Sequence, residues 1–142
     1  WGQNCIIGFK VEYNWYEIGS SDFLYAFFST VAYNLENKKW EIRFPIIMKR
    51  LYLGKLETTD ISSAIIELKM IQQGLRKFKP DKIIWDYENP KKQPPWGKNI
   101  SPDIIDLANY FVTSDGEDFL TIFLHALEKA KELNSAIEIQ SL

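Results

Sequence analysis

The sequence contains few of the side chains on which enzyme chemistry usually depends. It has one histidine, His125, and one cysteine, Cys5, in 142 residues. A Ser-His or Cys-His nucleophile, and most zinc sites, would therefore depend on a single side chain. His125 falls on the polar side of a helical pattern, and Cys5 lies in an apolar run. We interpret His125 as a surface residue and Cys5 as a small buried side chain.

Two pairs of carboxylates have spacings that acid and base catalysis could use. Asp103 and Asp106 are three residues apart, and Asp86 and Glu88 are two residues apart. Glycosidase chemistry needs one such carboxyl in an apolar pocket, and nothing in either spacing distinguishes these pairs from solvated charge. The glycines form neither a phosphate-binding loop nor a dinucleotide turn. The sequence therefore predicts no catalytic residue, no metal site and no cofactor, with a small enzymatic domain as the alternative.

The charges are distributed unevenly along the chain, although the net charge is only -2. Between Arg76 and Lys98, seven basic residues face three acidic ones, whereas from Ser101 to the end two lysines face eight carboxylates. Aromatic residues interleave the basic stretch, so a nucleic-acid-binding domain is a second alternative. No known RNA-binding or zinc-finger motif supports it. The acidic stretch fits a cationic protein partner better, because complementary potentials speed association and select partners.

No apolar run has the length of a membrane span, and no signal-peptide pattern is present. We therefore expect a protein of the cytoplasm that neither binds a membrane nor carries a disulfide framework. The composition is 46% hydrophobic and 15% aromatic, and the length suits one core. We expect a single domain over residues 1–142.

Three stretches predict strands because they are β-branched and aromatic or alternate between apolar and polar residues. They lie near residues 5–18, 82–87 and 136–140. The first is long enough to be one strand or a hairpin that turns near Asn14. Tyr110 to Val112 is a further candidate for extended backbone.

Apolar residues at helical spacing predict three long helices, near residues 21–35, 60–77 and 116–133. Ser114 and Glu117 have the spacing of a capping box for the last helix. Shorter helices are expected after Pro45 and after Pro102, since proline suits the first helical turn. This order of elements predicts an α+β fold in which a small, mostly antiparallel sheet packs against several helices.

Residues 88–99 show no periodic pattern, and five of the six prolines fall between Pro80 and Pro102. Long irregular loops in small domains are often functional. Most aromatic residues, such as Phe9, Phe27 and Phe123, fall on apolar faces and are expected in the core. Trp96 and Tyr87 do not fit such a face, so we expect them at an interface.

Several stretches of the sequence form a recognisable set. They are WYEIGS (15–20) leading into FL (23–24) and FFST (27–30), LYLGKL (51–56), PDKIIWD (80–86), PPWGKNIS (94–101) and NYFVTSDG (109–116). Together they resemble the immunity protein 70 family, which is found beside bacterial polymorphic toxins. The resemblance extends over about residues 6–133.

This resemblance implies a small cytoplasmic α+β protein that binds and neutralises a cognate toxin domain and protects the cell that produces it. It supplies no catalytic residue. On this hypothesis the inhibitor occludes the C-terminal domain of the toxin sterically and electrostatically. Loop 88–99 and the acidic C-terminal third are the expected surfaces, because aromatic residues dominate binding hot spots and acidic residues attract a cationic partner. The candidate toxin-binding residues are Tyr87, Glu88, Trp96, Asp103 and Asp106.

Overall fold

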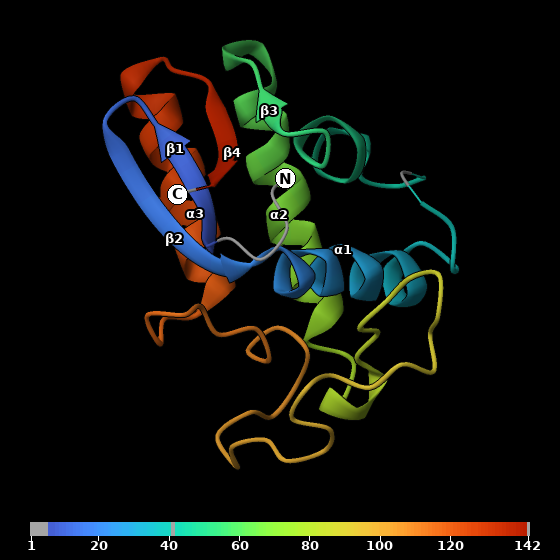
Figure 1. Ribbon diagram of the computed structural model, residues 1–142. Coiled ribbons are helices and arrows are strands. Elements are labelled where there is room, and N and C mark those ends of the chain that lie inside the picture. Colours follow the sequence, from blue (N-terminus) through green and yellow to red (C-terminus); the bar gives the residue numbers. More distant parts are fainter. Residues whose placement is uncertain (1–5, 41, 142) are drawn as a thin grey trace.

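The computed structural model describes residues 6–40 and 42–141 and is built on a four-stranded antiparallel sheet (Figure 1). The strands are β1 (Ile6–Val11), β2 (Asn14–Ser20), β3 (Lys55–Leu56) and β4 (Ile137–Ser141). Their order across the sheet is β2-β1-β4-β3. The strand from the end of the chain therefore pairs with both β1 and β3. The predicted α+β class is confirmed.

The first two strands form the hairpin that the sequence left open as one of two possibilities. Val11 pairs with Asn14, and Glu12 adopts a positive φ of 54° in the turn between them. Ile7 pairs with Gly19 but Gly8 pairs with Glu17, so Ile18 is an additional residue in β2 and forms a bulge. The prediction for Cys5 lies outside the described residues.

The described residues also form three α-helices on one side of the sheet. They are α1 (Ser21–Leu35), α2 (Ile61–Leu75) and α3 (Phe119–Leu133). The Ser20 hydroxyl accepts from the Phe23 N–H at the start of α1, as N-cap residues typically do. Shorter helical segments are η1 (Ile46–Leu51, a π-helix), η2 (Thr58–Asp60) and η3 (Pro80–Lys82).

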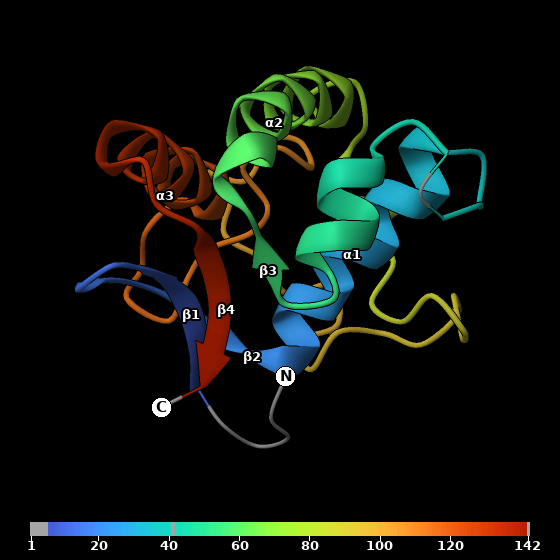
Figure 2. The same cartoon turned by 90° about the horizontal axis from the view of Figure 1, so that it is seen from above.

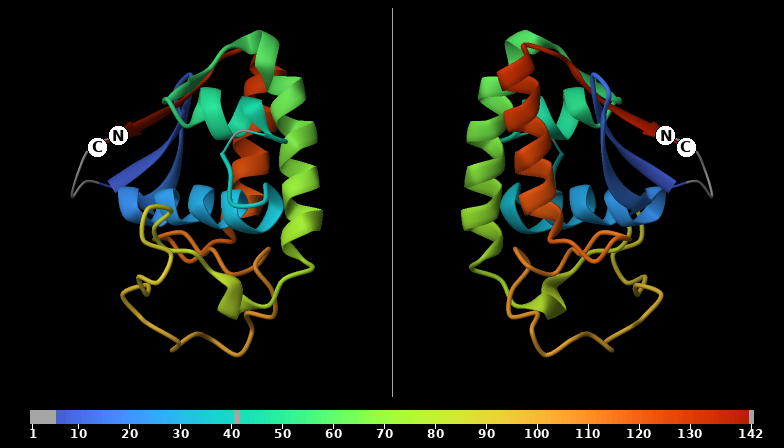
Figure 3. Two further views of the ribbon diagram at one scale, coloured as in Figure 1. Left: turned by 90° about the vertical axis from the view of Figure 1, so that its right-hand side faces the viewer. Right: turned by 90° about the vertical axis from the view of Figure 1, so that its left-hand side faces the viewer.

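The helices form layers behind the sheet. α3 packs on β1, and α2 packs on α3 (Figure 2). α1 runs crosswise near one end of both helices (Figure 3). Figure 3 shows that the connection from α2 to α3, residues 76–118, gathers on the far side of α1 from the body of the sheet.

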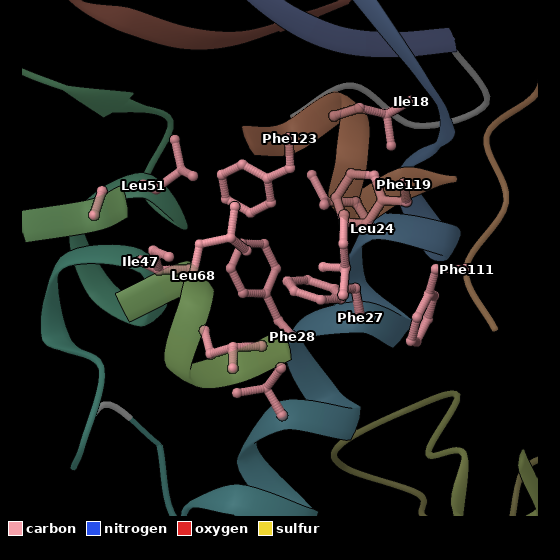
Figure 4. Close-up of a cluster of buried hydrophobic side chains, with 14 of the residues drawn as sticks. Ile18, Leu24, Phe27, Phe28, Ile47, Leu51, Leu68, Phe111, Phe119 and Phe123 are labelled. Carbon is pink, nitrogen blue, oxygen red and sulfur yellow. The ribbon is translucent and has the colours of Figure 1, made fainter. Parts of the chain in front are cut away.

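Phenylalanine rings fill the centre of the core (Figure 4). Phe27 of α1 is fully buried and lies 5.0 Å from Phe119 and 6.2 Å from Phe123, measured between ring centroids. Phe9 of β1 lies 4.8 Å from Phe123, so the sheet and α3 share this cluster. The expected core positions of Phe9, Phe27 and Phe123 are confirmed.

The prediction of a strand over residues 82–87 is wrong. This segment lies along α1, and side chains of α1 satisfy its backbone in place of a neighbouring strand. The Thr30 hydroxyl donates to the Ile84 carbonyl and accepts from the Ile84 N–H, both at 3.1 Å. The Tyr87 N–H donates to the Ser29 hydroxyl at 3.0 Å. β-branched and aromatic residues of segment 82–87 pack against the core, and Trp85 is only 7% exposed.

The prediction of a helix after Pro102 is also wrong. Two side chains bond to the backbone of this segment and compete with a helix. The Asn109 amide oxygen accepts from the N–H groups of Ile105 and Asp106, and the Asp106 carboxylate accepts from those of Ala108 and Asn109. The result is a chain of turns.

The predicted capping box does not form. The last helix begins at Phe119, and the Asp118 carboxylate caps it by accepting from the Thr121 N–H. The Ser114 hydroxyl instead donates to the Glu17 carboxylate at 2.7 Å. Thr113 stabilises the turn before the helix. Its hydroxyl accepts from the Glu117 N–H, and its carbonyl accepts from the Gly116 N–H.

Candidate protein-binding surface

The side chains that could support chemistry are dispersed. His125 is exposed on α3, and Asp86 and Glu88 lie far along the chain from it. Within residues 6–40 and 42–141, no three histidine, cysteine or acidic side chains gather as a metal ion would require. None of the described helices has the length and apolarity needed to cross a membrane. The side chains that do gather at the surface are aromatic.

Five half-buried aromatic residues form one connected group, which we call the tyrosine cluster. Trp40 is its centre, with ring centroids 5.0 Å from Tyr52, 5.0 Å from Tyr87 and 6.3 Å from Tyr25. Tyr33 completes it, 5.4 Å from Tyr87. Most of these pairs meet edge to face, an arrangement that aromatic quadrupoles favour. The cluster thus combines apolar rings with phenol groups on one surface.

Hydrogen bonds fix the cluster to the body of the protein. The Trp40 Nε1–H donates to the Met48 carbonyl at 2.6 Å. The Tyr87 hydroxyl donates to the Lys38 carbonyl at 2.9 Å. The backbone carbonyl of Tyr87 accepts from the Tyr33 hydroxyl at 3.4 Å. Since the rings are held before any partner arrives, binding through them costs little ordering entropy.

Two carboxylates, those of Asp86 and Glu88, lie beside the tyrosine cluster. Burial raises the pKa of Tyr25 to about 12, and the negative charge of Asp86 adds to this rise. Burial also raises the pKa of Tyr52, with a contribution from Glu88. None of the ion pairs between described residues includes Asp86 or Glu88. The tyrosine cluster is therefore flanked by two carboxylates that form no ion pair among the described residues.

The raised pKa of Tyr25 predicts a loss of stability in alkali. The folded chain keeps the Tyr25 proton up to about pH 12, whereas the unfolded chain loses it near pH 10. Because the folded state then binds more protons, the free energy of unfolding falls as the pH rises between these values. We expect a shallower fall in Tyr25→Phe, measured by urea unfolding at several pH values. Tyr13→Phe is the control, since Tyr13 is 98% exposed, and an unchanged slope in Tyr25→Phe would contradict the prediction.

Trp96 lies at the other end of α1 from Tyr87. Its indole Nε1–H donates to the Tyr110 hydroxyl at 2.8 Å, and its ring meets the edge of Trp85 at 5.3 Å. Trp96 nevertheless remains 40% exposed. Pockets of about 240 Å³ and 230 Å³ share Trp96 and Phe23 in their walls. Trp96 is therefore an exposed ring on a fixed support.

The five predicted binding residues do not form one patch. Tyr87 and Glu88 belong to the surface of the tyrosine cluster, and Trp96 lies near the first turn of α1. The Asp106 carboxylate is used by the turn at 106–109. Asp103 is exposed and follows the residues that line the pocket beside Trp96. Phe23 and Tyr33 are ten residues apart on α1, about 15 Å by helical rise, so one interface of ordinary size can span both ends.

Sequence reasoning missed Tyr25, Tyr33, Trp40 and Tyr52 as surface residues. One signal for two of them was present, because Tyr25, Ser29 and Tyr33 recur every four residues and so share a face of α1. That face binds the segment 84–87 and carries the cluster. Trp40 and Tyr52 contact aromatic residues from other elements, and the spacing of residues along the chain does not predict these contacts.

The structure also bears on the basic, aromatic-rich stretch between Arg76 and Lys98. Trp85, one of its aromatic residues, is buried against the core and is not available to stack on a base. Tyr87 is held between Trp40 and Tyr33 beside two carboxylates, which repel phosphate. A nucleic-acid interface therefore gains no support from this arrangement.

Comparison with known proteins identifies the family. The family model described as Immunity protein 70 matches residues 9–139, which extend from within β1 to within β4. Searches of curated proteins and of solved structures each found no match. The match agrees with the stretches of sequence that resemble this family and supports an immunity function. The chain belongs to the Immunity protein 70 family.

Proposed function

We propose that this chain is a stoichiometric inhibitor that binds the C-terminal domain of a cognate bacterial toxin and occludes it. Family membership supports the immunity function. The observation that carries the mechanism is the tyrosine cluster with Asp86 and Glu88 beside it. We further propose that residues 1–142 act as one domain, in the cytoplasm of the cell that produces the toxin.

The tyrosine cluster has the composition and rigidity of a binding surface. Tyrosine and tryptophan are enriched at interface hot spots, where they combine a large apolar area with a polar group. Tyr87 is firmly held in the cluster, because its ring contacts Trp40 and Tyr33 and its hydroxyl donates to the Lys38 carbonyl. A partner that covers it meets a surface already ordered for binding.

The charges beside the cluster select the partner. Asp86 and Glu88 have no ion pair among the described residues, so a basic group on the toxin can pair with them without displacing one. Such complementarity mainly increases the association rate and excludes acidic proteins. Asp103 is an exposed carboxylate that can pair with a basic group of the toxin, and Asp106 acts by holding the turn at 106–109.

Binding to the toxin domain encoded by the neighbouring gene tests the proposal. We expect Tyr87→Ala to weaken the affinity by about 30-fold or more, the effect of losing one hot spot of about 2 kcal/mol. Glu88→Lys should slow association, with a larger effect at low salt. Calorimetry and stopped-flow kinetics measure both, and growth of cells that express the toxin reports protection.

Controls separate binding from folding. Tyr13→Ala removes a 98% exposed tyrosine at the tip of the hairpin, and Glu128→Lys reverses an exposed charge on α3. Both should bind the toxin as the unmodified chain does. Thermal unfolding of Tyr87→Ala establishes that the chain is folded at the assay temperature. Equal affinity of Tyr87→Ala, Glu88→Lys and the controls would show that the toxin binds another surface.

A further inference from the structure

An apolar depression lies around Trp96. Two pockets adjoin there, of about 240 Å³ and 230 Å³, and both are lined by Phe23, Trp96 and Val112. Ile100 and Ile104 also line one pocket, and Ile18 and Pro95 also line the other. We call this pair of pockets the Trp96 groove. Each pocket is smaller than the roughly 300 Å³ at which small-molecule sites begin, so each suits one side chain of a larger partner.

The walls of the Trp96 groove are fixed by the core. Phe23 meets Phe111 and Phe119 edge to face, each at 5.7 Å, so its ring is both part of the core and part of the groove. Val112 is held by a bridge to Asp118, and its side chain is 44% exposed. The groove is thus formed in the free protein, with two apolar side chains, Trp96 and Val112, open to a partner.

One rim of the groove is acidic. Asp22 and Ser114 line the second pocket, and the Ser114 hydroxyl donates to the Glu17 carboxylate at 2.7 Å. The bulge in β2 leaves the Ile18 carbonyl without a partner in β1. This carbonyl accepts from the Ser114 N–H at 3.1 Å. This contact joins the segment after Val112 to β2 and brings Asp115 toward Glu17.

The carboxyl groups on this rim are close enough to affect each other. The negative charge of Glu17 raises the pKa of Asp115. Across the described part of the chain, no lysine or arginine forms an ion pair with Glu17, Asp22 or Asp115. Asp22 therefore lies in the wall of the groove, and Glu17 and Asp115 lie next to it through Ser114, with no ion pair among the described residues to offset their charge.

We propose that the Trp96 groove receives a segment of the toxin domain in which a large apolar side chain lies next to a lysine or arginine. The apolar side chain enters between Trp96 and Val112, and the basic group pairs with Glu17 and Asp115. This inference rests on the proposed function and adds a second contact with a defined chemistry. A nucleic acid fits poorly, because the acidic rim repels phosphate.

Two variants test the two halves of the contact, with the toxin domain as the probe. Val112→Asn makes the groove wall polar at similar size, and Asp115→Lys reverses the charge of an exposed rim residue. We expect Val112→Asn to weaken the affinity by about tenfold, as loss of a well-packed apolar contact does. Asp115→Lys should reduce the association rate by about tenfold at low ionic strength and less at high salt.

Matched controls address folding and nonspecific charge. Ile66→Asn changes an apolar residue that is 62% exposed on α2, and Glu128→Lys reverses an exposed charge on α3. Both should leave the affinity and the association rate within about twofold of the unmodified chain, as substitutions outside the contact do. Circular dichroism establishes that all four variants are folded. A toxin variant with an acidic residue in place of the contacting lysine or arginine should restore association with Asp115→Lys.

The outcomes separate this inference from the proposed function. If Tyr87→Ala loses affinity while Val112→Asn and Asp115→Lys match their controls, the groove is not a toxin contact and the proposed inhibitor mechanism stands. If Val112→Asn and Asp115→Lys lose affinity beyond their controls, the groove is supported independently of the tyrosine cluster. If the unmodified chain does not bind the toxin domain, both proposals are overturned.

Discussion

Replacing Phe27 by alanine is expected to lower the free energy of unfolding by about 3–5 kcal/mol, as large-to-small changes at fully buried aromatic positions do. Phe27 is fully buried, and its ring contacts Phe28, Phe111, Phe119 and Phe123 with centroids 5.0 to 6.2 Å apart. These four rings come from α1, from the segment before α3 and from α3. A cavity here therefore removes contacts among several elements at once.

Urea unfolding followed by circular dichroism measures the effect of Phe27→Ala. Phe27→Leu is the matched variant, because it keeps most of the apolar volume and should lose clearly less stability. Ile66→Ala, at a position 62% exposed on α2, should change the free energy of unfolding by about 0.5 kcal/mol or less, as surface substitutions usually do. A loss below about 1 kcal/mol in Phe27→Ala would mean that this ring does not organise the core.

Thr30→Val is expected to detach the segment that carries Tyr87. The Thr30 hydroxyl both donates to and accepts from the backbone of Ile84, and valine replaces it with a methyl group of similar size. Two backbone groups of Ile84 then lose their partner near the fully buried Thr30 side chain, which costs about 1–3 kcal/mol. Because Tyr87 follows three residues later, the affinity for the toxin should fall together with the stability.

Hydrogen exchange locates the effect of Thr30→Val. Protection of the Ile84 and Tyr87 amides should decrease, while the amides of α3 follow only the change in global stability. Thr59→Val is the control, since Thr59 is exposed and outside this contact. If Thr30→Val and Thr59→Val behave alike in stability and exchange, the hydroxyl of Thr30 does not hold this segment.

The structure of the long periodic segments could be predicted from the sequence. The first helix was expected over 21–35 and is found at Ser21–Leu35, and the helix expected over 60–77 is found at Ile61–Leu75. The last strand, expected over 136–140, is found at Ile137–Ser141. In these segments the intrinsic preference of the residues for helix or strand agrees with the burial of one face. Such agreement makes the hydrophobic periodicity a reliable predictor of secondary structure.

The predictions failed where side chains, in place of neighbouring backbone, satisfy the main chain. Residues 82–87 have strand-like composition, but Ser29 and Thr30 of α1 bond to them. The segment after Pro102 has the sequence pattern of a helix start. The side chains of Asn109 and Asp106 accept from its backbone N–H groups, so no helix forms. Ser114 has the spacing of a cap, but it bonds to Glu17, which is 97 residues away in the chain. Rules based on neighbouring residues in the sequence do not predict these contacts.

By itself the sequence determined the α+β class, the scarcity of catalytic side chains and the family, and it singled out Tyr87 and Trp96 as aromatic residues without an apolar face. Only the tertiary structure decided what surrounds those two residues. Tyr87 contacts Tyr33 and Trp40, and Trp40 joins it to Tyr25 and Tyr52. Trp96 shares its pocket with Phe23 and Val112. Periodicity does not encode these separations. The physical reason is that helix and strand patterns report which face is buried against the core, whereas a surface of side chains from several elements depends on how those elements pack.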